Sequence, residues 1–493
     1  MAHRGAVSPG RERMEPRYPA GPRDLSIRVF ANRLPVVRAP TGWRVAGGGL
    51  VTALRPVLRS RGGSWVGWGG SREEPPPRLP GLPFDLRSIS LGPRLVAAYY
   101  HGFSNQTLWP LLHDLVHQPV IDGVWWEAYQ TANELFADAA GPLEEERGPS
   151  VLWVHDYHLM LLPGLLRRGV HRSPILFFLH TPFPAPELFA RLPWRVELLE
   201  GMLGADVVGF HTALYRDNFV RTCARLLPNV TVEGHTIRLP DGRAVRCTPH
   251  PISVDVEDLV QRVEQPAVRR RVTRLRDQFG QQTVMLGVDR LDYTKGILQR
   301  LRALELLLER RADLRGRLTL VQIAEPSRFE EPKYREIRVE VEQAVGRING
   351  RFTDPGRAVP VLYMYRNIPL QRLVSYFLLA DVCLVTPLKD GMNLVAKEYV
   401  VCQAAASGDG VLVLSEFAGA AEELRQALLC NPFDEEGLSR RIEEALDMPP
   451  ADRRERIQAM GRQVRRQDVF AWATSVLAEA ERVMAHGRSG RAG

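Results

Sequence analysis

The 493-residue chain lacks long apolar runs and is poor in cysteine. No stretch approaches the roughly 20 consecutive apolar residues that a membrane-spanning helix needs, so we expect no contact with a membrane. The first residues carry Arg, Pro and Gly without an apolar core, and we therefore expect no secretory signal. The cysteines are odd in number and show no CxxC spacing, so they predict neither disulfides nor a zinc site but a protein of the reducing cytoplasm. They are Cys223, Cys247, Cys383, Cys402 and Cys430.

Lysine is also scarce. Of the 65 basic residues only four are lysines, and three of these, Lys295, Lys389 and Lys397, lie in motifs described below. Because arginine is the default cation of this chain, a lysine indicates a position that needs a compact ammonium group. The formal net charge of +8 is compatible with anionic substrates. It is spread along the chain instead of gathered in blocks, so we do not expect nucleic-acid binding.

The most informative stretch is residues 381–400, DVCLVTPLKDGMNLVAKEYV. Its first part predicts a buried parallel strand, its middle a polar turn that contains a glycine, and its last part the first turns of a helix. Such a unit directs free backbone N–H groups at an anion. The carboxylates of Asp390 and Glu398 are good acceptors for sugar hydroxyls. Two interpretations fit this stretch equally well: a nucleotide-sugar site, or an ordinary strand–helix unit with a solvated acidic turn.

Polar clusters also follow the predicted strands of the first half. The apolar strand 151–154 ends in HDYH at 155–158, and the strand 175–179 ends at His180. Arg33 likewise follows the first predicted strand. Because the carboxyl ends of parallel strands meet at one edge of a sheet, these groups are expected to face a ligand crevice. HDYH lacks a further cluster of ligands, so we expect no metal.

In the second half the predicted strand 284–288 is followed by Arg290 and Lys295 before the next helix begins. Two cations in a strand-to-helix loop suit the neutralisation of a diphosphate leaving group, although a solvated loop with local ion pairs would have the same composition. Near the start of the chain, Gly47, Gly48 and Gly49 open a helical pattern and allow the backbone to approach a phosphate or a sugar.

Alternating strands and helices in both halves predict an α/β protein with two doubly wound, Rossmann-like domains facing a cleft. We divide the chain into a disordered N-terminal extension (1–24), an N-terminal domain (25–248), a C-terminal domain (249–450) and a C-terminal helix with a flexible tail (451–493). This last helix is expected to pack back toward the first domain. The boundary is placed at PHPISVDV, where two prolines interrupt the pattern.

Shorter signals give local expectations. Asp241-Gly242 predicts a hairpin turn, and Pro266 should break the helical stretch that runs from 257 to 279. We expect one helix over 187–201 and one amphipathic helix over 451–486.

The motifs together resemble the trehalose-6-phosphate synthase family of retaining glycosyltransferases. The matching segments run from about Val29 to Asp434 and include ANRLP, GGL, YHGFSNQTLWP, WVHDYHLMLLP, FFLHTPFP, GVDRLDYTKG, AEPSR, GRINGRF, LVTPLKDGMNLVAKEYV and LSEFAGAA. The resemblance implies a GT-B fold with its active site between the two domains. It also implies transfer of glucose from a nucleotide-diphosphate glucose to glucose 6-phosphate, with no cofactor or metal, by a homo-oligomer.

The resemblance assigns roles to individual residues. The catalytic set would be Arg290, Lys295, Asp390 and His180. The donor would be bound by Gly48, Gly49, Arg290, Lys295, Ile368, Asp390, Gly391, Met392, Asn393, Leu394, Val395 and Glu398. The acceptor would be bound by Arg33, Tyr100, Trp109, Asp156 and Arg328.

Some points stay open at this level. The donor base is not determined, and Pro369 after Ile368 is a local variation beside it. A sister enzyme with another acceptor, of the glucosylglycerol-phosphate or cyclitol type, and an inactive sugar-phosphate-binding regulatory subunit are the alternatives. The intact acceptor residues argue against the first, and the complete donor set argues against the second. No DxDx[TV] motif follows, so we expect no built-in trehalose phosphatase.

Overall fold

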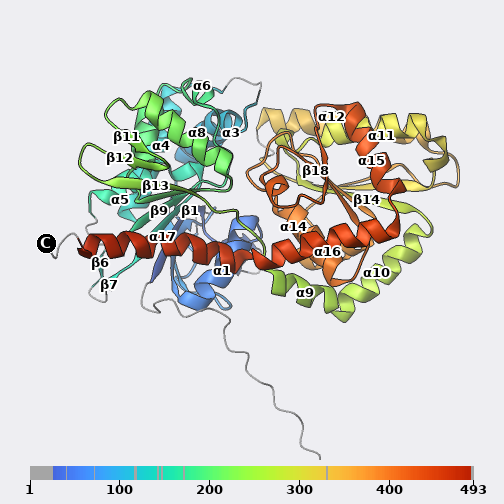
Figure 1. Cartoon of the computed structure of the whole chain (residues 1–493), viewed down its shortest axis with the longest axis horizontal. Coiled ribbons are helices and arrows are strands. Elements are labelled where there is room, and N and C mark those ends of the chain that lie inside the picture. Colours follow the sequence, from blue (N-terminus) through green and yellow to red (C-terminus); the bar gives the residue numbers. More distant parts are fainter. Residues whose placement is uncertain are drawn as a thin grey trace, which may run out of the picture.

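Two sheets, each covered by helices, lie side by side in the computed structural model (Figure 1). The structure describes residues 26–489 apart from 40–41, 72, 116–118, 142–143, 146–147, 170–172 and 329–330. The expected extension at 1–24 and the last residues of the expected tail lie outside the described residues. The five cysteines are buried and free. Among the described residues, no helix combines the length and apolar character that crossing a membrane requires.

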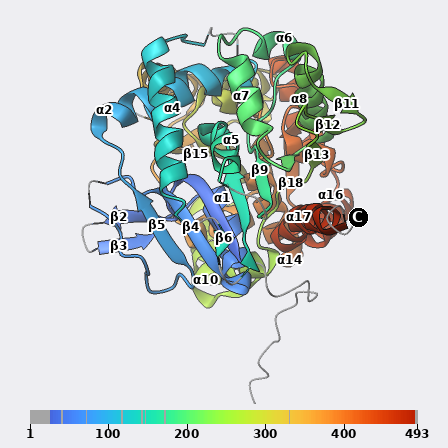
Figure 2. The same ribbon diagram turned by 90° about the vertical axis from the view of Figure 1, so that its left-hand side faces the viewer.

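The first sheet is parallel at its centre and antiparallel at one edge. Its order is β11-β12-β13-β10-β9-β8-β1-β4-β5, and Figure 2 looks at it from the side of the first domain. The expected hairpin is confirmed, because β12 pairs antiparallel with β13. The strands are β1 (Ile27–Arg33), β4 (Gly63–Trp68), β5 (Asp85–Ile89), β8 (Val151–His155), β9 (Ile175–Phe178), β10 (Val207–Phe210), β11 (Thr231–Glu233), β12 (Thr236–Arg238) and β13 (Ala244–Pro249). Two small hairpins are β2 (Val36–Ala39) with β3 (Gly42–Val45), and β6 (Glu144–Glu145) with β7 (Gly148–Pro149).

Side chains that alternate along the strands fill the two faces of this sheet. Val29 and Trp153 belong to one hydrophobic cluster, whereas their neighbours Phe30 and Val154 belong to another. The helices are α1 (Gly49–Arg61), α2 (Pro93–Val96), the π-helix η1 (Ala97–Leu108), α3 (Trp109–Leu112), α4 (Gly123–Asp138), η2 (Tyr157–Leu159), α5 (Leu162–Arg167), α6 (Pro186–Phe189), α7 (Arg195–Met202) and α8 (Ala213–Leu226). The single helix expected over 187–201 is wrong, since Pro193 separates α6 from α7.

The second sheet is entirely parallel, in the order β16-β15-β14-β17-β18-β19. Its strands are β14 (Thr283–Arg290), β15 (Leu318–Glu325), β16 (Val361–Tyr365), β17 (Val382–Val385), β18 (Val411–Ser415) and β19 (Leu428–Cys430). The helices are α9 (Val256–Glu264), α10 (Pro266–Phe279), η3 (Tyr293–Lys295), α11 (Ile297–Arg310), η4 (Ala312–Leu314), α12 (Pro332–Phe352), α13 (Leu370–Leu379), α14 (Leu394–Ala405), η5 (Gly419–Glu422) and α15 (Glu435–Asp447). Pro266 opens α10, so the predicted break is confirmed. Two facing α/β domains are the fold class that the sequence predicts.

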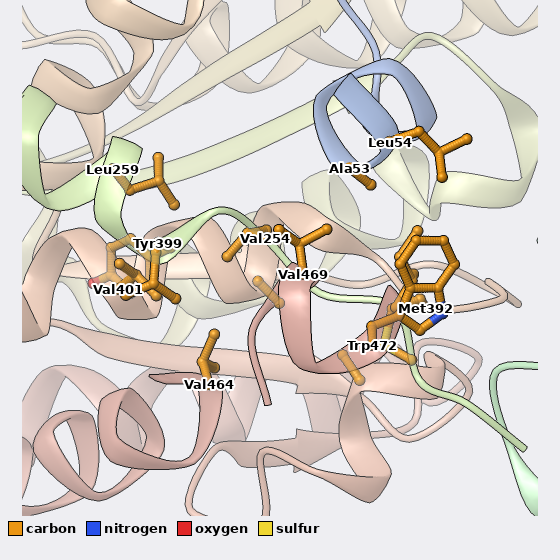
Figure 3. Packing of buried hydrophobic residues seen from close by; sticks show 14 of the residues in the cluster. Ala53, Leu54, Val254, Leu259, Met392, Tyr399, Val401, Val464, Val469 and Trp472 are labelled. Carbon is orange, nitrogen blue, oxygen red and sulfur yellow. The ribbon is translucent and has the colours of Figure 1, made fainter. Parts of the chain in front are cut away.

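Two helices, not one, end the described chain: α16 (Pro450–Arg466) and α17 (Val469–Ser489). They separate at Asp468, whose carboxylate accepts hydrogen bonds from the N–H groups of Phe470 and Ala471 and so caps α17. Figure 1 shows α16 beside the second domain and α17 crossing the first. In Figure 3, Val469 lies beside Val254, and Trp472 lies beside Met392. The hydrophobic cluster that contains these residues joins both domains.

Candidate active site

Residues at the carboxyl ends of the two sheets meet between the domains. In the first domain these ends carry Arg33 and His155, and in the second they carry Arg290 and Glu325. Contacts cross the interface directly: the guanidinium carbon of Arg290 lies 5.6 Å from the ring centroid of Trp109. Groups of both domains therefore meet where the crevice is expected.

Three arginines surround the hydroxyl of Tyr100, which comes from the π-helix η1. Burial alone would raise the pKa of Tyr100, but the positive charges of Arg328, Arg33 and Arg290 outweigh it, so this pKa lies below its ordinary value. Arg33 stacks on the ring of Trp68, with its guanidinium carbon 3.9 Å from the ring centroid. Several guanidiniums around a phenol form a strongly positive environment that suits a phosphate.

Trp109 and Arg328 form a wall of this positive cluster. The Arg328 guanidinium carbon lies 4.3 Å from the Trp109 ring centroid, a cation–π distance. The indole N–H of Trp109 is buried without a hydrogen-bond partner among the described residues, so it is a donor with no protein acceptor. An oxygen of a bound ligand would satisfy it.

Asp156 has a strained backbone and a perturbed carboxyl. It follows β8 with φ of 74°, a conformation that is uncommon outside glycine. Its carboxylate accepts a hydrogen bond from the His180 backbone N–H at 3.3 Å. Burial raises the pKa of Asp156 to about 6, against the opposing effect of this and a neighbouring amide. A carboxylate held in this way is suited to accept hydroxyl hydrogens of a sugar.

His180 lies beside two further histidines. Its Nε2 is 3.0 Å from Nδ1 of His155, and its ring centroid is 5.2 Å from that of His211. Burial holds the pKa of all three well below the ordinary value, so the rings are neutral. The bond between His155 and His180 therefore carries one shared proton and fixes the orientation of the His180 ring.

On the second-domain side, Lys295 and Asp390 form a nearly buried ion pair of 2.6 Å. Burial alone would raise the pKa of Asp390, but the charge of Lys295 outweighs it and lowers this pKa below the ordinary value. Asn393 donates to the same carboxylate oxygen at 3.1 Å. The structure thus brings together three of the residues predicted to bind the donor.

Two helix N-termini meet at the domain interface. α1 begins at Gly49 and α14 at Leu394, and a Cβ built on Gly49 would lie 3.0 Å from Cδ1 of Leu394. The Asn393 side chain accepts from the N–H of Ala396, which leaves the amides of Leu394 and Val395 at the free end of α14. Both helices therefore direct the positive ends of their dipoles at one region, as an anion requires.

Gly391 makes a close backbone contact with the other domain. A Cβ on Gly391 would overlap the carbonyl oxygen of His180, which belongs to the other domain. The neighbouring Met392 is 3% exposed and its side chain packs into the hydrophobic cluster, so only its backbone is left for a ligand. Tyr215 donates to the Asp390 carbonyl at 3.1 Å and supports the same turn from the first domain.

Glu398 lies in α14 near a second carboxylate, Glu325. Burial, with the charge of Glu325 as a second cause, raises the pKa of Glu398 to about 7. Burial also raises the pKa of Glu325, while the backbone amide of Ile368 opposes the shift. Ile368, predicted beside the donor base, thus lies next to the carboxylates.

The sequence interpretation missed several residues of this region. Tyr157 and Tyr334 contact Arg328, Asp292 accepts from Tyr334, and Asp114 forms an ion pair with Lys389 across the domains. Of these four, Tyr157 lies in the HDYH motif and Asp292 in GVDRLDYTKG, whereas the scarcity of lysine pointed only to Lys389, the partner of Asp114. Among the described residues, no group of three His, Cys, Asp or Glu side chains has the geometry of a metal site.

Two facing Rossmann-like domains with this interface define a GT-B glycosyltransferase. The model of glycosyltransferase family 20 matches residues 27–482. The chain belongs to this family. The sequence prediction of a retaining glycosyltransferase of the trehalose-6-phosphate synthase family is therefore confirmed.

Relatives and solved structures agree with this assignment. The trehalose-6-phosphate synthase of Mycolicibacterium smegmatis is 45% identical over 480 residues, which cover 94% of this chain and 93% of the relative. The synthase of Mycolicibacterium gilvum is 47% identical, with 91% and 92% covered. A structure from Burkholderia xenovorans in complex with glucose-6-phosphate gives a TM-score of 0.84 at 35% identity, covering 93% of this chain and all of that one. A structure from E. coli bound with UDP-2-fluoro glucose gives 0.84 at 34% identity, covering 92% and 98%.

Proposed function

We propose that this chain transfers glucose, with retention of configuration, from a nucleotide-diphosphate glucose to glucose 6-phosphate and so forms α,α-trehalose 6-phosphate. The observation that carries the proposal is the pairing of two different anion sites at one interface. A cluster of guanidiniums around Tyr100 suits a phosphomonoester, and two converging helix N-termini suit a diphosphate.

The donor lies on the side of the second domain. Arg290 and Lys295 bind its diphosphate, together with the amides of Leu394 and Val395 and with Gly48 and Gly49 from the first domain. Glu398 accepts the ribose hydroxyls, and Ile368 lies at the base. His180, Asp390 and the turn from Gly391 to Asn393 hold the transferred glucose. The Lys295–Asp390 pair supports this arrangement, because it keeps a cation and a hydroxyl acceptor 2.6 Å apart.

The acceptor lies on the side of the first domain. Its phosphate is bound by Arg33, Tyr100 and Arg328, Trp109 forms the wall, and Asp156 accepts the sugar hydroxyls. The stack of Arg328 on Trp109 and the positive charge around Tyr100 support these roles.

The reaction follows from the charges in this arrangement. As the diphosphate departs, negative charge grows on its oxygens and positive charge grows on the glucosyl carbon. Arg290, Lys295 and the helix N-termini stabilise the first, and Asp390 lies near the second. The acceptor hydroxyl attacks from the face that the diphosphate leaves, and a departing phosphate oxygen takes its proton. Catalysis then rests on positioning and fixed charge without an enzymic nucleophile.

UDP-glucose is the favoured donor, because the relative from E. coli was solved with a UDP-glucose analogue. Assembly into a homo-oligomer is an expectation that rests on the family resemblance alone. A sister enzyme that uses glycerol 3-phosphate would need the same donor residues and a phosphate site of the same kind, so the choice of acceptor is what separates the two functions.

Nucleotide release from UDP-, GDP- and ADP-glucose, each with glucose 6-phosphate, glucose or glycerol 3-phosphate, tests the proposal. Release that depends on glucose 6-phosphate and yields trehalose 6-phosphate supports it and identifies the base. Release with glycerol 3-phosphate instead supports the sister enzyme. Binding of sugar phosphate without release from any pair supports the regulatory subunit.

A further inference from the structure

Arg328 is a nearly buried cation in a connecting segment of the second domain. It follows β15, has φ of 45°, and its side chain is 6% exposed. Its two terminal nitrogens bind two different phenols: Nη1 donates to the Tyr334 hydroxyl at 2.7 Å, and Nη2 donates to the Tyr157 hydroxyl at 2.9 Å. The plane of the guanidinium is therefore fixed at both ends.

The two phenols come from different domains. Tyr334 lies in α12 of the second domain, whereas Tyr157 lies in η2 of the first, 171 residues from Arg328. Arginine has only donors, so each phenol oxygen accepts a hydrogen bond from Arg328 and its O–H group donates one to another acceptor. Tyr334 donates to Asp292 at 2.9 Å, and Tyr157 donates to Oδ1 of Asn105 at 3.1 Å.

This chain of hydrogen bonds continues from Asn105 in the first domain to Glu331 in the second domain. Nδ2 of Asn105 donates to Oε1 of Glu331 at 3.2 Å, and Glu331 is 5% exposed at the start of α12. From Glu331 to Asp292 the direction of every hydrogen bond is consistent with its neighbours. Burial raises the pKa of Tyr157, which keeps its hydroxyl protonated as the donor that Asn105 needs.

We propose that Tyr157 is a positioning residue that holds Arg328 across the domain interface for the phosphate of the acceptor. The two phenols use two of the five N–H donors of the guanidinium and leave others for phosphate oxygens. The acceptor site is then complete only when the first domain supplies Tyr157 to the second. The inference rests on the proposed function, since that function makes Arg328 a phosphate ligand.

The test compares Tyr157→Phe with Tyr334→Phe, each of which removes one hydroxyl and keeps the ring. The control is Tyr399→Phe, which removes a buried hydroxyl bonded to the Ala380 carbonyl in the core of the second domain. Steady-state kinetics are measured by varying glucose 6-phosphate at saturating UDP-glucose, and by varying UDP-glucose at saturating glucose 6-phosphate. Tyr157→Phe should raise the KM for glucose 6-phosphate about tenfold, the loss expected for one hydrogen bond to a charged group.

UDP-glucose binds in the other half of the site, so Tyr157→Phe should leave the KM for UDP-glucose within about twofold of the wild-type value. In an Arg328→Ala background the same substitution should add no further loss, because the two residues act as one unit. An equal rise in the KM for both substrates, an unchanged KM for glucose 6-phosphate, or a full additional loss in the Arg328→Ala background would overturn the inference. So would a control that raises the KM as much as Tyr157→Phe does.

A binding measurement separates this inference from the proposed function. Calorimetric titration measures the affinity of the positive cluster for inorganic phosphate and needs no turnover. Binding that weakens about tenfold in Tyr157→Phe but not in Tyr399→Phe supports the inference, even if the wild type forms no trehalose 6-phosphate. Equal binding in all three proteins would overturn it.

Discussion

The two halves of the site recognise anions in different ways. The donor side combines charged side chains with backbone groups, namely two helix N-termini and a glycine that contacts the opposite domain. The acceptor side uses side chains, with the guanidiniums of Arg33 and Arg328 beside the Tyr100 phenol and with Arg328 stacked on Trp109. A backbone site is damaged by adding atoms, and a side-chain site by removing them.

The largest effect is expected from one added methyl group. In Gly391→Ala the new Cβ would overlap the His180 carbonyl oxygen, so the turn must move or the domains must separate. We expect kcat/KM to fall by more than about 10³-fold while the fold persists, because misplaced groups lose their preorganised effect. The matched control is Gly350→Ala in α12, where an added Cβ meets nothing within 4 Å. Equal activity in both variants would show that this contact is unimportant.

A smaller loss is expected when one donor-side cation is removed. Arg290→Ala should lower kcat by about 10²-fold, the cost of losing one preorganised group that stabilises developing charge. Its KM for the acceptor should change little if Arg290 acts on the leaving group. Pre-steady-state and steady-state rates provide the measurement, and an unchanged kcat would remove Arg290 from the mechanism.

Substitutions in the acceptor half should change the KM for the acceptor instead of kcat. Arg328→Ala removes the cation that Tyr157 and Tyr334 hold, and we expect the KM for glucose 6-phosphate to rise about 30-fold through loss of charged hydrogen bonds. The KM for the nucleotide sugar serves as the internal control. An effect confined to the donor would reverse the assignment of the two halves.

The donor half should also respond to pH through the carboxyl group of Glu398. Glu398, with its pKa raised to about 7 by burial and then by Glu325, accepts ribose hydroxyls best as the carboxylate. Donor kcat/KM, which reports the free enzyme, should therefore fall as pH drops below about 7, by up to about tenfold per unit. Glu398→Gln should abolish this dependence. A flat profile in the wild type between about pH 6 and about pH 8, roughly one unit on either side of this pKa, would contradict the role of the carboxylate.

The smallest effect concerns the neutral histidine pair. His155→Asn keeps an amide that can hydrogen-bond to His180 near the position of Nδ1, and His155→Leu removes this group. We expect the leucine variant to lose about fivefold in kcat, and the asparagine variant to recover most of this, because one neutral hydrogen bond orients His180. Thermal unfolding of both variants checks that the difference is not one of stability.

The sequence predicted the parts of this molecule that local patterns determine. The strand predicted over 284–288, the helix start predicted at Asn393 and the break at Pro266 each depend on neighbouring residues, and the structure has these elements with end positions shifted by at most two residues. The break between α16 and α17 was missed because amphipathic periodicity continues through Asp468. The cap formed by that residue was a local signal that could have revealed it.

Contacts between residues far apart in the chain could not be predicted from the sequence. Tyr157 and Arg328 are 171 positions apart, and Asp114 and Lys389 are 275 apart. Each pair can be recognised only when the relative position of the two domains is known. The sequence singled out Arg328 and Lys389 as candidate functional residues, but only the fold shows which side chains they contact.

The most direct test of the account is the structure of the product. UDP-glucose labelled with ¹³C at the anomeric carbon, incubated with glucose 6-phosphate, should give a product whose NMR spectrum shows an α,α-1,1 linkage and one phosphate. That result requires the donor and acceptor halves to act together with retention. A β linkage, or a labelled product that forms equally well without the phosphate group of the acceptor, would contradict it.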